Sequence, residues 1–266
     1  MFDHSFMIRA FLAGGMIALI APTIGIFLVH RRMSFMVDAL AHVCLGGIAL
    51  GFLLAWNPIL TAVVVAVLGA LLVEQLRSGG QLEGDSALAL LLYGSLGIAS
   101  IMLNVAEGPG VHLESLLFGS ILTVRPVDLV VILILGCVVA LCVTKLYKPL
   151  FCLVFDEEWA ETAGLPVKKL NAILMLLAAL TVAVSLRIVG VLLVGALMTI
   201  PVIAASTIRK GFFVTLLSSI GISLLSVGAG ITLSYYIGWP SGGTIVVVML
   251  GIALLINIIN RFMYSR

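Results

Sequence analysis

The chain has 266 residues, of which 62% are hydrophobic and 10% are charged, and its mean hydropathy is +1.30. Soluble domains carry about 25% charged residues, so this composition excludes a soluble enzyme and predicts an all-α polytopic membrane protein. The net charge of +2 gives no reason to expect nucleic acid as a partner, because the basic residues fall between the apolar segments.

We predict one membrane domain, residues 1–266, that contains about nine transmembrane helices of about 20 residues each, or eight if one short segment is re-entrant. Turn-forming sequences such as Asn57-Pro58 and Ser78-Gly79-Gly80 separate the apolar segments. The predicted spans are roughly 6–29, 35–56, 58–76, 86–105, 127–146, 169–186, 188–206, 212–237 and 243–260.

The placement of Lys and Arg predicts the orientation of these helices. If the loop at Arg31–Arg32 is cytoplasmic, 11 of the 14 Lys and Arg residues fall on the cytoplasmic side. This bias is what the positive-inside rule requires. We therefore expect the N-terminus outside the cell and the C-terminus in the cytoplasm.

The second segment carries two ionisable side chains, Asp38 and His42. Such residues cost about 2.5–3.5 kcal/mol at the centre of a membrane helix and mark functional sites by default. Residues four positions apart project from the same side of a helix, so this carboxylate and imidazole can form half of a divalent-metal site. The alternative is a buried ion pair, or a polar pair that joins two helices.

The same segment divides into two predicted faces. Leu45 and Ala49 fall within about 40° of Asp38 on a helical projection, so this face is predicted to line a pathway. Gly47 and Gly51 form a GxxxG pair near the opposite side, where small residues let helices approach closely. GxxxG is common in membrane helices, so by itself it is a weak indication of packing.

Two connections carry further patterns. The outer connection, residues 105–126, contains a short amphipathic segment at 111–119, including His112, that we expect at the membrane interface. It could seal the outer mouth or bind a ligand. The inner connection, residues 147–168, is predicted to contain a short helix. In that helix Asp156 is the N-cap, Gly164 the left-handed C′ residue and Pro166 the stop signal.

The inner helix has two interpretations. Phe155, Trp159 and Ala163 have i,i+4 spacing and would stack on one face, which could press into a groove on a partner protein. Alternatively, Trp159 rests among lipid headgroups at the interface. The chain contains no Gly-Lys dipeptide, so it lacks a phosphate-binding loop of the Walker type. Any ATP hydrolysis is therefore expected on a partner subunit.

Four segments resemble the membrane subunits of zinc/manganese ABC importers, in the family's order and over nearly the whole chain. They are RRMSFMVDALAH at 31–42, LFGSILT at 117–123, FDEE at 155–158 with Ala160 and GLPV at 164–167, and VGVLLV at 189–194 with Ile200-Pro201. Val37 and Val43-Cys44 depart from the family's commoner residues next to the first motif.

The resemblance implies a helical bundle like that of the cobalamin importers, in a homodimeric permease of the bacterial cell membrane. An extracellular metal-binding lipoprotein would deliver the ion, and cytoplasmic ATP-binding subunits would dock on a coupling helix. The family's metal ligands correspond to Asp38 and His42, and two copies would supply four ligands. The coupling residues correspond to Phe155, Asp156, Glu157, Glu158, Trp159, Ala160 and Gly164.

Zinc is the preferred cargo, because FDEE at 155–158 and GLPV at 164–167 look more like the zinc branch of the family. Manganese or iron is the alternative, because carboxylate and imidazole ligands do not separate these metals cleanly. No permanently bound cofactor is expected, and ATP would bind to the partner. A less favoured alternative is an ion-coupled secondary transporter. Asp38 follows Arg32 by only six residues, about 9 Å of helix. The pair is therefore expected near the cytoplasmic side unless the arginines are drawn into the protein.

Overall fold

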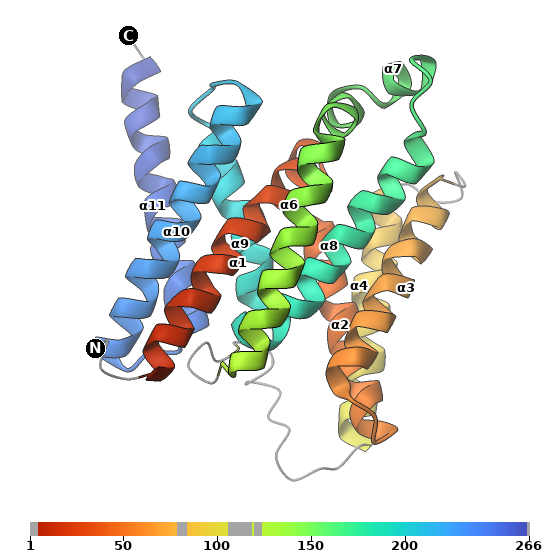
Figure 1. Ribbon diagram of the computed structural model, residues 1–266, viewed down its shortest axis with the longest axis vertical. Coiled ribbons are helices and arrows are strands. Elements are labelled where there is room, and N and C mark those ends of the chain that lie inside the picture. The colour runs from red at the N-terminus through yellow and green to blue at the C-terminus, as the bar shows by residue number, and fades with distance from the viewer. Residues whose placement is uncertain (1–4, 79–83, 106–118, 120–123, 265–266) are drawn as a thin grey trace.

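Figure 1 shows the computed structural model, which describes residues 5–78, 84–105, 119 and 124–264. Every regular element within these ranges is a helix, and a helix lies at each of the nine predicted segments, which confirms the predicted fold class. The helices are α1 (Ser5–His30), α2 (Phe35–Leu53), α3 (Pro58–Ser78), α4 (Gly84–Val105), α6 (Pro126–Phe155), α7 (Glu157–Thr162), α8 (Val167–Val189), α9 (Val191–Ser206), α10 (Phe212–Ile237) and α11 (Ser241–Tyr264).

Seven of the described helices are long and apolar enough to cross a membrane, namely α1, α2, α3, α6, α8, α10 and α11. The apolar part of α4, Leu88–Met102, and the 16-residue helix α9 are shorter. A helix of that length spans about 24 Å at 1.5 Å per residue, which is less than the hydrocarbon thickness of a bilayer. Most residues of α9 are buried against other helices.

The helices form a central layer with two flanks. The apolar windows of α1, α2 and α8 are each 67% buried, whereas that of α11 is 22% buried. Figure 1 shows α3 and α4 on one side of this layer and α10 and α11 on the other. The outward faces of α6, α10 and α11 carry exposed Leu, Ile and Val side chains, as expected for helices that contact lipid.

Glycines mark the closest helix approaches. A Cβ built on Gly25 of α1 would overlap the Met198 carbonyl of α9. On α2, a Cβ at Gly47 would lie 2.7 Å from the Cα of Ala62, and one at Gly51 would lie 2.6 Å from the Cα of Pro58. The neighbour that the GxxxG pair contacts is therefore α3, and residues larger than glycine would separate the two helices.

The inner connection is shorter than predicted because α6 continues to Phe155. The apolar run ends after residue 146, where the sequence becomes less hydrophobic, but the helix continues beyond that point. Beyond that point Phe151 and Phe155 pack on each other and on Phe212 of α10, with ring centroids 4.7–6.1 Å apart. The prediction that Phe155 and Trp159 stack on one helix is therefore wrong, since they belong to α6 and α7.

The two ends of the molecule differ. α1 begins at one end and α11 finishes at the other, the end that also carries α7 (Figure 1). The predicted interfacial helix at 111–119, with His112, lies outside the described residues except for Gly119. Gly119 has φ +61°, and a Cβ there would overlap the backbone of Val189 and Gly190, where α8 gives way to α9.

Candidate metal site

Asp38 and His42 lie on one half-buried stripe of α2. Positions 38, 42, 46 and 50 are all half-buried, whereas all the remaining residues from Met36 to Gly51 are buried. Leu45 and Ala49, predicted to share the pathway face, are 1% and 0% exposed. The open stripe therefore follows i,i+4 steps, and packing against neighbouring helices covers the positions on either side of it.

The ring of His42 has a defined orientation. Its Nδ1 lies 2.8 Å from the backbone carbonyl oxygen of Asp38, one turn earlier in the helix. A carbonyl oxygen only accepts hydrogen bonds, so Nδ1 carries the proton and donates it. The lone pair of Nε2 is then available to a metal ion, as in the many metal sites where the second ring nitrogen is held by a backbone carbonyl.

The carboxylate of Asp38 points towards α9. Its Oδ1 occupies the space that a side chain at Gly195 would fill, because a Cβ built there would overlap that oxygen. The Gly195 carbonyl accepts a hydrogen bond of 2.7 Å from the Thr199 hydroxyl, one turn further along α9. The site is therefore formed by two helices. α2 supplies the Asp38 and His42 side chains, and α9 leaves space for the carboxylate because Gly195 has no side chain.

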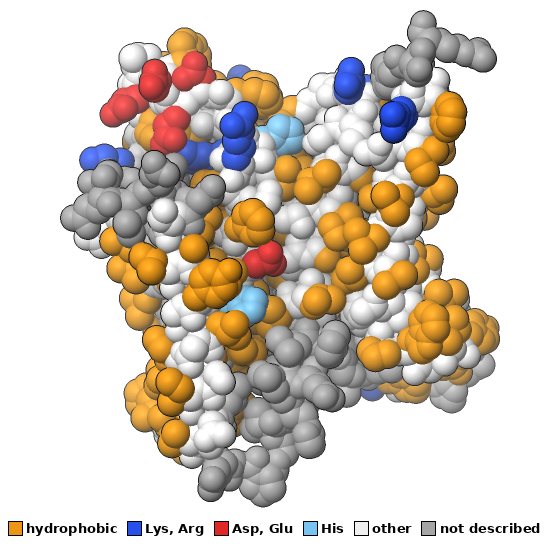
Figure 2. Space-filling model, turned by 180° about the vertical axis from the view of Figure 1, so that it is seen from behind, with side chains coloured by type: hydrophobic (Ala, Val, Ile, Leu, Met, Phe, Trp, Pro, Cys, Tyr) orange, Lys and Arg blue, Asp and Glu red, His pale blue; other side chains and the backbone are white. Residues whose placement is uncertain are grey.

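One chain supplies two ligands here. Within the described ranges no group of three or more His, Cys, Asp and Glu side chains is close enough to hold a metal ion. Structural zinc sites have four ligands, so a complete site would need further ligands from outside this pair. Figure 2 shows an acidic and a His side chain lying together between the two ends of a mostly hydrophobic face.

Arg31, in the turn before α2, has a buried side chain. Arg31 has a side chain that is 4% exposed and forms an ion pair of 2.7 Å with Glu157. Its Nη1 donates a hydrogen bond to Asn171 of α8. The expected depth of the Asp38 pair is counted from Arg32, which is exposed, so the burial of Arg31 leaves that expectation unchanged.

The predicted short helix of the inner connection is present as α7. The Asp156 carboxylate accepts a hydrogen bond from the Trp159 N–H at 2.8 Å, which confirms the N-cap. Gly164 has φ +80°, and the bonds Leu165 N–H to Ala160 and Gly164 N–H to Glu161 form a Schellman motif. The predicted left-handed C′ residue is thus confirmed.

The surface around α7 is acidic and aromatic. Figure 2 shows acidic side chains gathered at the end of the molecule that carries α7. Phe155 and Trp159 are 59% and 56% exposed, and Glu158 is exposed, while Ala160 faces the protein with no exposed area. This surface is distinct from the Asp38 stripe.

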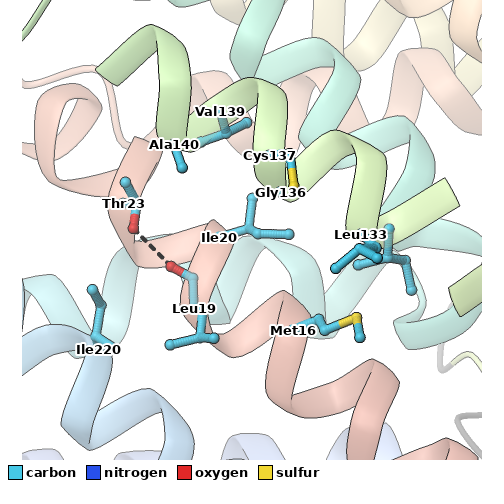
Figure 3. Close-up of a pocket in the computed structure, with 11 residues that line it drawn as sticks. Met16, Leu19, Ile20, Thr23, Leu133, Gly136, Cys137, Val139, Ala140 and Ile220 are labelled. Atoms are coloured by element: carbon cyan, nitrogen blue, oxygen red, sulfur yellow. Dashed lines mark hydrogen bonds between the residues drawn. The ribbon is translucent and has the colours of Figure 1, made fainter. Parts of the chain in front are cut away.

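An apolar cavity of about 330 Å³ lies between α1, α6 and α10 (Figure 3). The hydroxyl of Thr23, the most polar side chain in its wall, donates a hydrogen bond of 2.7 Å to the Leu19 carbonyl. The other lining residues are Met16, Leu19, Ile20, Ile132, Leu133, Gly136, Cys137, Val139, Ala140 and Ile220. Carboxylates and imidazoles are absent from this wall, so the cavity offers no counterpart to the Asp38 pair.

Sequence reasoning missed three residues at these sites. Asn171 is a single amide in the otherwise apolar run of α8, a signal that could have drawn attention to it. Arg31 was used as a topology signal and as part of the RRMSFMVDALAH motif, and no buried ion pair was predicted for it. Gly195 was one of 27 glycines, and no pattern in the sequence separates it from the others.

Known proteins match this chain over nearly its whole length. A family model described as the ABC 3 transport family matches residues 3–260. The chain is 36% identical to a Treponema pallidum protein named "Probable metal transport system membrane protein", covering 96% of this chain and 97% of the relative. It is 32% identical to the high-affinity zinc uptake system membrane protein ZnuB of Haemophilus influenzae, covering 90% and 91%.

A manganese transport system membrane protein, MntC of Halalkalibacterium halodurans, is 30% identical and covers 92% of this chain and 84% of its own length. Among solved structures, a chain of PsaBC from Streptococcus pneumoniae in complex with Fab superposes with a TM-score of 0.85. That chain is 25% identical, and the match covers 96% of the present chain and 91% of the other.

Proposed function

This chain belongs to the ABC 3 transport family, and we propose that it is the membrane-spanning subunit of an ATP-driven importer whose cargo is zinc. Its relatives include membrane proteins of zinc and of manganese transport systems. The family supplies the membrane component of ABC importers, in which ATP is hydrolysed on a partner. The chain's own contribution is therefore the pathway for the metal.

One observation carries the proposal. The hydrogen bond from His42 Nδ1 to the Asp38 carbonyl leaves Nε2 free on the same half-buried stripe as the Asp38 carboxylate. If the ionisable pair served only to join two helices, both side chains would form hydrogen bonds or ion pairs with other protein groups. Here each group keeps a coordinating atom, which is the arrangement that a transported cation requires.

A second copy of the chain would complete the coordination. Two copies related by a two-fold axis would bring two carboxylates and two imidazoles together, enough for a four-coordinate divalent ion. The half-buried stripe of α2 would face that axis. In this homodimer the ion would be held by ligands from both chains and released when the chains move apart.

Zinc is preferred over manganese because FDEE at 155–158 and GLPV at 164–167 resemble the zinc branch of the family. The relatives include both metals, and a site of carboxylates and imidazoles suits either, so the ligands alone do not provide the preference. The exposed Phe155, Glu158 and Trp159 would contact the cytoplasmic ATP-binding subunits, with Asp156, Glu157, Ala160 and Gly164 shaping and anchoring α7. An extracellular metal-binding lipoprotein would deliver the ion at the opposite end.

The proposed function implies an orientation in the membrane. The end of the molecule that carries α7 and the last turn of α11 would lie in the cytoplasm, and the N-terminus outside the cell. The cytoplasmic end would then hold the basic residues at Arg31–Arg32, Lys168–Lys169 and Arg209–Lys210, as the positive-inside rule requires.

The test is uptake by the purified complex, with its ATP-binding subunits and binding protein, in liposomes. We expect ATP-dependent zinc uptake that excess unlabelled zinc suppresses and equal manganese does not. Preferential manganese uptake would overturn the choice of cargo and leave an ATP-driven metal importer. Uptake by this chain alone, driven by an ion gradient without ATP, would overturn the importer itself and favour a secondary transporter.

A further inference from the structure

Arg31 occupies the turn between α1 and α2 and is almost fully enclosed. Its Nη2 lies 2.7 Å from Glu157 Oε2 at the start of α7. Its side chain is 4% exposed, while that of Glu157 is 41% exposed. An ion pair with one nearly buried member is a poor source of stability, because desolvation offsets much of the attraction. Its presence therefore calls for another explanation.

Asn171 of α8 closes the ion pair into a triangle. Its Oδ1 accepts a hydrogen bond from Arg31 Nη1, and its Nδ2 donates one of 2.9 Å to Glu157 Oε1. Asn171 is 2% exposed. The three side chains thus join three segments by hydrogen bonds: the α1–α2 turn, the first residue of α7 and the first turns of α8. Two of the three side chains, those of Arg31 and Glu157, are charged, which strengthens these bonds.

The turn that carries Arg31 is rigidly built. The bonds Met33 N–H to Leu28 and Arg32 N–H to Val29, 2.9 and 3.0 Å long, form a Schellman motif at the end of α1. Arg32 takes the left-handed position with φ +59°, where glycine is the usual residue. A non-glycine residue stays in that conformation only where the surroundings fix it. α2 begins at Phe35, two residues after the buried Met33.

Most of the short helix α7 is exposed, and its other main contacts are with α6 and α8, the helices on either side of it in the chain. Ala160 is its only buried residue, and Glu158, Trp159 and Glu161 are exposed. The Glu157 contact with Arg31 therefore fixes the N-terminal end of α7 directly to the segment that leads into α2. From Arg31 to Asp38 the path runs through one turn and the first turn of a helix, with no flexible linker.

We propose that Arg31 is a positioning residue that couples the movement of α7 to α2 and so to the Asp38–His42 pair. The proposal rests on the proposed function, in which α7 receives the force of the ATP-binding subunits. Arg31, Glu157 and Asn171 would keep the α1–α2 turn and α7 moving as one body. A shift of the docking helix would then tilt α2 and change the distance between the ligand pairs of the two copies.

The first experiment replaces Arg31 in the complete reconstituted complex. Arg31→Gln should still assemble with the ATP-binding subunits and hydrolyse ATP. The zinc transported per ATP hydrolysed should fall about tenfold, within the usual 5–150-fold range of coupling between sites. Arg31→Lys keeps the charge but not the forked geometry, and should lie between Arg31→Gln and the wild type. A merely structural role would lower assembly, hydrolysis and transport in proportion.

Arg32→Asn is the matched control. It removes a neighbouring positive charge while allowing the left-handed conformation, and it should leave the zinc-to-ATP ratio unchanged. An unchanged ratio in Arg31→Gln, or an equal loss in Arg32→Asn, would overturn the proposal. Absence of zinc transport in the wild-type complex would instead contradict the proposed function, so the two failures can be told apart.

A second measurement does not depend on substituting Arg31. Spin labels at Phe35→Cys and Glu161→Cys, in a background with the four native cysteines replaced, report the separation of α2 and α7. We expect this distance to be the same in nucleotide-free and ATP-bound complexes. The distance from Glu161→Cys to Ile259→Cys on α11 should change. A change in the Phe35–Glu161 distance on ATP binding would show that α7 moves independently of α2 and would overturn the proposal.

Discussion

Two polar clusters on the path from α7 to α2 differ in how their hydrogen-bonding groups are used. In the Arg31–Glu157–Asn171 triangle, each side chain bonds to the other two. In the Asp38–His42 pair, one ring nitrogen is bonded to the backbone and the other coordinating groups face a half-buried stripe. Both clusters place charge among apolar helices, where unpaired charge is costly.

The difference separates two roles. A cluster whose groups are all paired holds elements together, because removing one member leaves buried partners unsatisfied. A pair whose coordinating atoms are not bonded to protein groups can bind and release an ion, as a transport site must do. We therefore propose that the fully paired cluster transmits movement between helices and that the open pair binds the ion.

The largest effect is expected at the open pair. Asp38→Asn and His42→Ala each remove a ligand, and zinc uptake should fall at least about 100-fold, because coordination at a four-ligand site is lost in both copies. Uptake of radiolabelled zinc by the reconstituted complex measures this. Leu50→Ala, on the same stripe, is the control and should transport normally. Normal uptake by both ligand variants would remove the distinction between the two clusters.

Gly195→Ala tests whether the space left by the missing side chain of Gly195 positions the Asp38 carboxylate. The new Cβ would overlap Oδ1 and displace it. We expect zinc affinity to fall about 10–100-fold, the usual effect of disturbing groups that orient a metal ligand. Calorimetric titration of the purified complex gives the affinity. Gly221→Ala on α10, where a Cβ meets no atom within 4 Å, should bind zinc as the wild type does. Equal affinity in both variants would argue against this positioning.

Gly47→Val tests the packed side of the same helix. Its side chain would collide with the backbone of α3 near Ala62, and overpacking of this kind costs about 1–3 kcal/mol. We expect a lower thermal unfolding midpoint in detergent. Gly94→Val on α4, where nothing lies within 4 Å of the added Cβ, should unfold at nearly the wild-type temperature. A wild-type midpoint for Gly47→Val would show that α2 and α3 can separate freely.

The smallest effect is expected at the cap of α7. Asp156→Ala removes the acceptor of the Trp159 N–H and should destabilise the helix by about 1 kcal/mol. Faster amide hydrogen exchange within Glu157–Thr162 would report it. Glu161→Ala, on the exposed side, should leave exchange unchanged. If Asp156→Ala also leaves exchange unchanged, the Arg31 contact alone holds the N-terminal end of α7.

Much of the candidate site follows from local sequence. Asp38 and His42 share a stripe because i,i+4 positions always do so on a helix, and the bond from His42 to the Asp38 carbonyl is made within one turn. The cap at Asp156 and the stop at Gly164 likewise depend on residues a few positions apart. Local rules of this kind need no knowledge of the rest of the chain.

Tertiary packing decided the rest. The membrane helices are apolar on nearly all sides, so no periodicity told which face of α2 would stay open, and Leu45 and Ala49 turned out buried. Residues 31, 157 and 171 meet only because three helices converge, and Gly195 matters only because Asp38 points at it. The sequence alone determined the helices and their polar pair. The contacts between helices determined which polar side chains are paired across helices and which lie on the open stripe of α2.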